Sequence, residues 1–151
     1  MASHRPVVLI GGKLSLLPAG DTLAAKVQEV DVIELQAKEV LVAGMAVYCS
    51  AGFQVMKAKA DDDTKANVLG LALAPAALDA YVQVQTDGVF ELADWTQAAG
   101  SAALEIGTDY FLDTTAGVLT GNVPATGNLV YVGRAISPQK LEISVQRAIR
   151  L

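Results

Sequence analysis

The residue types that could carry chemistry are few in this chain, and their spacing does not suit it. His4 is the only histidine, and it lies beside Arg5 and Pro6, away from every predicted strand. Ser–His–Asp and Cys–His catalysis both need a histidine held within hydrogen-bond reach of the nucleophile. The sequence therefore excludes a catalytic triad, and we expect no enzyme.

The run Asp61, Asp62 and Asp63 is the one candidate for a metal site. Loops that bind Ca²⁺ place carboxylates at alternate positions and add a distant Glu. Three consecutive aspartates point in different directions instead, and lysines surround them. We predict a solvated hairpin tip with no bound metal.

Glu91 and Asp94 are close enough in sequence to resemble the paired carboxylates of a glycosidase. A sugar cleft is rich in aromatic side chains, however, and only Trp95 is near. Trp95 has two open roles: it anchors its loop on the core, or it fills a pocket on a neighbouring subunit.

Phosphate-binding motifs are also missing. Gly11, Gly12 and Lys13 supply a lysine but neither the second half of a P-loop nor a following helix. We expect no cofactor.

Composition favours a structural protein in a permanent assembly. Apolar residues make up 52% of the 151 residues, aromatics 5% and charged residues 18%, below the usual quarter of a soluble chain. So few charges indicate surfaces that a partner covers. The net charge of −5 and the scattered basic residues argue against a nucleic-acid partner.

No apolar run is long enough to span a membrane, and the N-terminus does not resemble a secretion signal. Cys49 is the only cysteine, so an internal disulfide is excluded. We predict that Cys49 is a small buried hydrophobe and that the protein is made and folded in a reducing cytoplasm.

Short β-prone runs recur about every ten residues, with turn signals between them. This spacing predicts an all-β fold, a compact barrel or sandwich of short antiparallel strands. Residues 30–36 favour a strand with a bulge between Val32 and Ile33, and a helix over 23–37 is the competing interpretation. Residues 95–103 form a loop or a short helical turn. Hairpins are expected around residues 50–52, 87–88, 114–117 and 137–140.

The same pattern of residues occurs twice, 63 positions apart. Five residues have a counterpart at this offset, which predicts an internal duplication, although short strands and glycine turns also repeat by chance. The matched pairs are Gly44 with Gly107, Gly70 with Gly133, Ala72 with Ala135, Pro75 with Pro138, and Val82 with Val145.

The first 24 residues differ from the single β-rich domain predicted over residues 25–151. Two apolar runs separated by glycines cannot form a core alone. They are either the first hairpin of the domain or an extended arm that adds to a neighbour's sheet edge.

Several stretches resemble small decoration proteins of tailed bacteriophages, which are also called cement proteins. The resemblance extends over nearly the whole chain in the order and spacing of small apolar residues. The stretches are 43–48, 68–72, 81–92, 107–112 and 132–135. Residues 11–23 also resemble the N-terminal stretch of phage tail-fibre proteins.

The resemblance implies a virion structural protein that binds the outside of an assembled capsid and stabilises it. It further implies a homotrimer that contacts the major capsid protein, with no catalytic residues and no membrane. The alternative is a tail-fibre or receptor-binding module. The residues expected to contact the capsid or another subunit are Arg5, Val7, Val8, Leu9, Ile10, Leu14, Leu16, Leu17 and Trp95.

Overall fold

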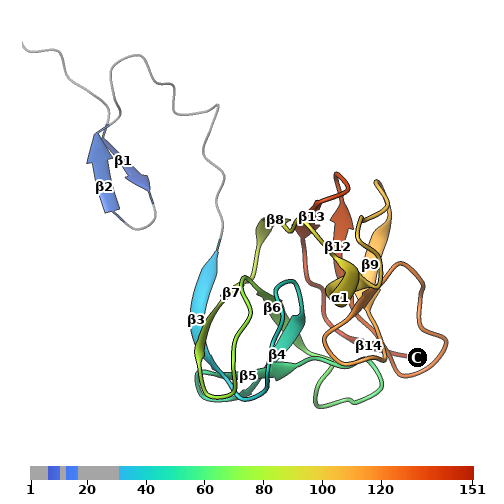
Figure 1. The fold of residues 1–151 in the computed structure, drawn as a ribbon. Coiled ribbons are helices and arrows are strands. Elements are labelled where there is room, and N and C mark those ends of the chain that lie inside the picture. Colours follow the sequence, from blue (N-terminus) through green and yellow to red (C-terminus); the bar gives the residue numbers. More distant parts are fainter. Residues whose placement is uncertain (1–6, 11–12, 17–30) are drawn as a thin grey trace, which may run out of the picture.

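The computed structural model describes residues 7–10, 13–16 and 31–151. Regular structure in these residues is almost entirely β, which confirms the all-β prediction (Figure 1). The single described helix is α1 (Thr96–Ala99). The strands are β1 (Val7–Ile10), β2 (Lys13–Leu16), β3 (Val32–Ala37), β4 (Ala46–Ala51), β5 (Gln54–Lys57), β6 (Val68–Ala72), β7 (Tyr81–Gln85), β8 (Gly88–Glu91), β9 (Asp109–Leu112), β10 (Leu119–Thr120), β11 (Asn128–Leu129), β12 (Tyr131–Ala135), β13 (Lys140–Ile143) and β14 (Ile149–Arg150).

The first five strands after the N-terminal hairpin form a closed barrel in the order β3-β5-β4-β6-β7. Most neighbours are antiparallel, as expected. The exception is the pair that closes the barrel, because β3 and β5 run parallel, with Gln36 opposite Gln54 and Ala37 opposite Val55. The predicted barrel is therefore confirmed, but its strands are not all antiparallel.

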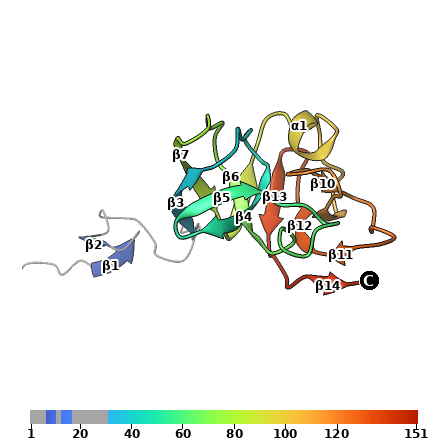
Figure 2. The same cartoon turned by 90° about the horizontal axis from the view of Figure 1, so that it is seen from below.

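A second five-stranded sheet repeats the order of the barrel strands as β10-β9-β12-β13-β8. Strands β4 and β6 correspond to β9 and β12 at an offset of 63. In both pairs the register shifts by one residue at the same place, at Leu69 in β6 and at Val132 in β12. The sequence repeat is thus a repeat of structure. The two units lie side by side (Figures 1 and 2).

The offset changes in the last strand of each unit. Val84 pairs with Ala72 in the barrel, and Leu141 pairs with Ala135 in the second sheet, so β7 corresponds to β13 at an offset of 57. The sequence match of Val82 with Val145 is therefore wrong, because Leu141 follows Ala135 by six residues whereas Val84 follows Ala72 by twelve.

The second unit is not closed as the first is. Among the described residues no pairing joins β8 to β10, the counterparts of β3 and β5. The chain leaves β8 after Glu91 and forms α1, which contacts β10. Trp95, fully buried at the start of α1, occupies the core on this side of the sheet.

The two units share a core. One cluster lies inside the barrel and includes Leu35, Val47 and Val84. The larger cluster combines second-unit residues such as Phe90 with Ala46 and Leu71 from the barrel. The larger cluster therefore joins the two units. The predicted boundary at residue 24 lies outside the described residues.

Backbone hydrogen bonds between small residues join the units along a seam. Ala46 N donates to Gly117 O at 2.9 Å, and Gly117 N donates to Ala58 O at 2.7 Å. Asn128 N donates to Ala60 O at 2.9 Å. All three alanines are fully buried, and their small side chains let the backbones approach.

The predicted hairpin across Asp87 and Gly88 is wrong. Gly88 N donates to the Asp87 side chain at 2.8 Å, so the turn forms locally. The strands on either side nevertheless pair elsewhere, β7 with β3 and β6, and β8 with β13. This turn is the crossing from the barrel to the second sheet.

The predicted bulge at Val32 and Ile33 is also wrong. Both residues pair in unbroken register with Gln85 and Val84. The first half of β3 is exposed, so no alternation of buried residues is required there. The strand interpretation of residues 32–37 is confirmed over the helix.

Other local predictions are confirmed. Hairpins form between β4 and β5, β9 and β10, and β12 and β13. Residues 96–99 form the expected helical turn. Strands β1 and β2 form a two-stranded antiparallel sheet, so this part of the predicted extended arm is a hairpin.

The duplicated glycines Gly70 and Gly133 generate a stability prediction. A Cβ at Gly70 would lie 2.2 Å from Gln85 O, and one at Gly133 would lie 2.3 Å from Glu142 O. Because the obstacle is backbone, Gly70→Ala or Gly133→Ala should lower the free energy of unfolding by about 2–3 kcal/mol, as overpacked sites do. Urea denaturation measures this loss.

Gly52→Ala is the matched control, because no atom lies within 4 Å of the position that its Cβ would take. It should change the free energy of unfolding by less than about 1 kcal/mol. Equal effects of all three substitutions would contradict the strand pairing described above.

Candidate functional site

The acidic run is a structural loop. The Asp62 carboxylate accepts hydrogen bonds from Thr64 Oγ1 at 2.6 Å and Thr64 N at 2.9 Å. The Thr64 hydroxyl, followed by the Thr64 amide, holds the pKa of Asp62 below its ordinary value. Within the described ranges, no group of three or more potential metal ligands is assembled.

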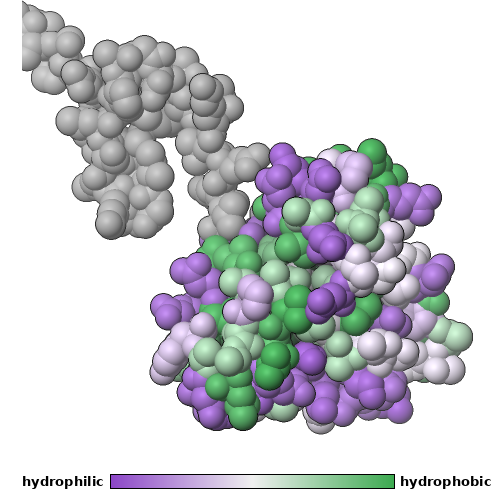
Figure 3. Space-filling view, in the orientation of Figure 1, coloured by the Kyte–Doolittle hydropathy of each residue, from purple (hydrophilic) through white to green (hydrophobic). Residues whose placement is uncertain are grey.

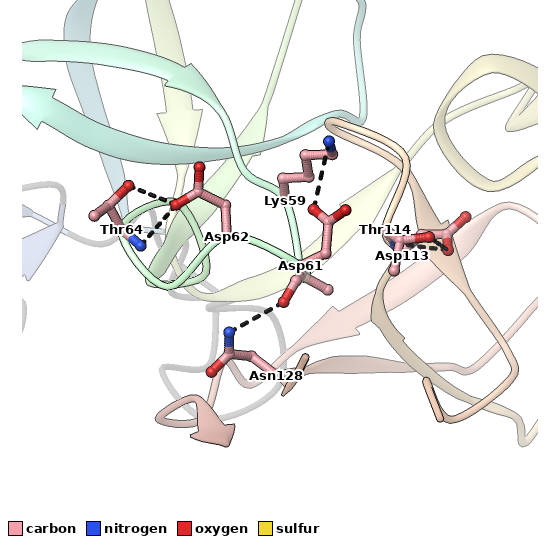
Figure 4. A network of polar contacts seen from close by, with 8 residues as sticks. Lys59, Asp61, Asp62, Thr64, Asp113, Thr114 and Asn128 are labelled. Atoms are coloured by element: carbon pink, nitrogen blue, oxygen red, sulfur yellow. Dashed lines mark hydrogen bonds and ion pairs between the residues drawn. The ribbon is translucent and has the colours of Figure 1, made fainter. Parts of the chain in front are cut away.

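Figure 4 shows the Asp62–Thr64 bonds, the Asp61–Lys59 ion pair and the Asn128 amide beside this loop. Asp61 forms an ion pair with Lys59 at 3.4 Å. Asp63 pairs with Arg150 and accepts from Asn128 Nδ2 at 2.9 Å, while the same amide donates to Ala60 O at 3.1 Å. The loop therefore fastens the C-terminal strand β14 and the β11 segment to the barrel.

Asp94 is hydrogen-bonded to Thr96, two residues along the chain. Its carboxylate accepts from Thr96 Oγ1 at 2.5 Å and Thr96 N at 2.9 Å, at the start of α1. These bonds, the hydroxyl first, lower the pKa of Asp94. A glycosidase acid would need a raised pKa instead.

A second ionic cluster lies on the outer face of the second sheet. Arg134 Nε donates to Asp109 Oδ1 at 2.8 Å, which lowers the pKa of Asp109 and raises that of Arg134. Burial raises the pKa of the neighbouring Tyr131. Because both charges are exposed, this pair orients two strands and contributes little to stability.

Trp95 takes the first of its two expected roles. Its indole Nε1 donates to Gln139 O at 3.2 Å, and its ring packs edge-on against Phe90 with centroids 5.6 Å apart. The side chain has no exposed surface, so it offers nothing for another subunit to cover. We do not retain Trp95 as a contact residue.

Cys49 is exposed, so the prediction of a buried hydrophobe is wrong. The second half of β4 extends past the core, and its alternate residues Cys49 and Ala51 face outward. The thiol contacts Ala51 O at 3.1 Å.

The predicted arm residues are only partly described. Val7, Val8, Leu9 and Ile10 lie in β1, and Leu14 and Leu16 lie in β2. Arg5 and Leu17 lie outside the described residues, as does His4. The register pairs apolar positions with each other, Val7 with Leu16 and Leu9 with Leu14.

Sequence reasoning missed an exposed apolar surface, which we name the barrel-end face. It consists of Val40, Phe53, Leu78 and Tyr81 at the end of the barrel where the β4–β5 turn lies. Hydrophobic residues gather over the barrel in Figure 3. One feature of the sequence could have revealed this surface. In the turn formed by Gly52 and Phe53, the aromatic residue stands at the second position, where glycine is usual.

No described helix has the length and hydropathy to cross a membrane.

Comparison with known proteins identifies the family. A family model described as phage cement protein matches residues 64–143, just over half of the chain. The chain belongs to the phage cement protein family. The matched segment begins before β6 and ends with β13, so it contains the whole second sheet and the end of the barrel.

No curated protein matches the chain. Three chains of solved structures do. One, from "The capsid of Myoviridae Phage XM1", is 20% identical, with a TM-score of 0.45 over 83% of this chain and 89% of that chain.

The family confirms the prediction of a bacteriophage cement protein, a structural protein that binds an assembled capsid and stabilises it. It gives no support to the tail-fibre alternative.

The three hydrogen-bonded carboxylates generate a prediction about acid stability. Asp62, Asp94 and Asp109 each have a folded pKa below the ordinary 3.8. Their stabilisation is present above that value and is lost as the pH falls through the lowered folded pKa. The variant D62N/D94N/D109N should therefore lose less Tm between pH 7 and pH 3 than the unaltered chain.

Thermal melts across this pH range test the idea. The control E34Q/E91Q/E105Q removes three exposed acids outside these hydrogen bonds. A triple aspartate variant as acid-sensitive as the unaltered chain would show that these bonds do not govern acid stability.

Proposed function

We propose that this cement protein binds the outside of the assembled capsid as a homotrimer and bridges neighbouring subunits of the major capsid protein. The observation that carries the proposal is the family match over residues 64–143. The low proportion of charged residues, 18%, supports a surface that is largely covered in use.

Stabilisation would follow from mass action. A protein that binds the assembled shell and not its separated or expanded subunits adds its binding free energy to the assembled state. Joining three copies raises the effective concentration of the second and third contacts. Many copies, each binding modestly, would then oppose expansion of the shell.

We propose that an N-terminal arm makes the contact with a neighbouring capsid subunit. Its residues are Arg5, Val7–Ile10, Leu14, Leu16 and Leu17. The hairpin β1–β2 forms a two-stranded sheet of its own. An isolated two-stranded hairpin is marginally stable in water, so it gains most when a partner covers it. Strand addition to a capsid subunit would supply that partner.

We further propose that the virion is assembled in the host cytoplasm. The exposed, unpaired Cys49 is compatible with a reducing compartment, where it would stay a thiol.

Deletion of residues 1–17 tests the arm. The shortened chain should keep its barrel and its thermal melt, because the described core begins at Leu35. It should lose binding to capsids of the encoding phage prepared without the protein. Cosedimentation measures the bound fraction.

A pair of point variants refines this test in the full-length chain. L9D/L14D places charges at one register pair of the hairpin, whereas S15A at a neighbouring position serves as the control. If both the deletion variant and L9D/L14D bind capsids as the unaltered chain does, the N-terminal residues are not the contact.

The oligomeric state has its own test. Light scattering of the purified full-length chain should give three times the chain mass of 15.7 kDa. A monomer at micromolar concentration that stays monomeric on the capsid would contradict the trimer.

A further inference from the structure

The barrel-end face holds the four most exposed of the large apolar side chains in the first unit. Exposed fractions are 75% for Phe53, 68% for Tyr81, 62% for Val40 and 59% for Leu78. Single exposed apolar residues are normal on a protein surface, but a contiguous group marks an interaction site.

Backbone contacts bring three of these four residues together. Gln36 N donates to Phe53 O at 2.9 Å, and Gln36 lies opposite Tyr81 in the β3–β7 pair. Gln36 Nε2 donates to Asp79 O at 3.1 Å, which places the turn carrying Leu78 beside the same residue. Phe53, Leu78 and Tyr81 therefore surround Gln36.

Phe53 occupies its position at a cost to folding. The β4–β5 turn closes with Ala51 opposite Gln54, and Phe53, its second central residue, has φ 57°. Bulky side chains rarely adopt a positive φ, and glycine or asparagine normally stands there. Gly52, one position earlier, does not use a positive φ. An exposed aromatic in a strained turn indicates a functional contact.

Two of the charged residues beside the face make contacts within the chain. Lys38 forms an ion pair with Asp79, and the Glu39 carboxylate accepts from Lys57 N at 2.8 Å. Lys38 therefore has its counter-charge in Asp79 within the chain, and the partner surface that fits the apolar side chains of the face is mostly apolar.

We propose that the barrel-end face docks on an apolar patch of the assembled capsid, with Phe53 as its central contact. This inference rests on the proposed function, because the phage cement protein family identifies the capsid as the partner. The face is a second contact, separate from the arm, and it lies on the folded barrel.

Substitution of Phe53 gives a test with two readouts of opposite sign. F53G relieves the strained φ and removes the aromatic ring, so it should raise Tm while weakening capsid binding about tenfold or more. Y81S should weaken binding without raising Tm. Capsids of the encoding phage, prepared without the protein, serve as the probe in a cosedimentation titration.

The control is I149S, because Ile149 is 60% exposed but lies in β14, away from the barrel-end face. It should bind as the unaltered chain does. All variants are made in the full-length chain, so the arm is present throughout.

The outcomes separate this inference from the proposed function. If the unaltered chain does not bind capsids, the proposed function fails and this inference fails with it. If the unaltered chain and F53G bind alike, only the barrel-end face is overturned. If F53G dissociates a trimer in light scattering, the face is a contact between copies and the inference is wrong.

Discussion

The seam of small residues between the two units is the constraint on which the rest of the structure depends. Ala46, Ala58 and Ala60 are fully buried there, and their backbones bond to the second unit. A Cβ at Gly127 would lie 2.9 Å from Ala60 O, and one at Gly117 would meet Met45. Larger side chains would separate the units and open the shared core. The abundance of alanine and glycine therefore has a packing reason.

The two copies of the repeated unit have diverged in how they close. In the first, Ala37 at the end of β3 pairs with β5 and completes a barrel. In the second, the chain forms α1 instead, and Trp95 fills the core beside Phe90. This difference explains why the one tryptophan is structural. The two most exposed aromatic residues, Phe53 and Tyr81, lie on the barrel instead.

Local features of the sequence predicted most strands, three hairpins and the duplication, because alternation and turn residues act over a few positions. They failed at Asp87 and Gly88, where the turn is local but the choice of strand partner depends on two sheets. The burial of Cys49 was also predicted wrongly, because it depends on how far along β4 the core extends, and the local sequence does not show this. The barrel-end face was missed because its residues come from four segments; the order Gly52-Phe53 was its one local sign in the sequence, and the positive φ of Phe53 shows the strained turn.

Cryo-electron microscopy of the virion tests the central claim most directly. The account predicts density for this chain on the outer surface of the capsid, with the β4–β5 turn directed at the shell and the N-terminal segment crossing to a neighbouring subunit. Density confined to the tail, or a barrel whose Phe53 end faces solvent with no shell contact, would contradict it.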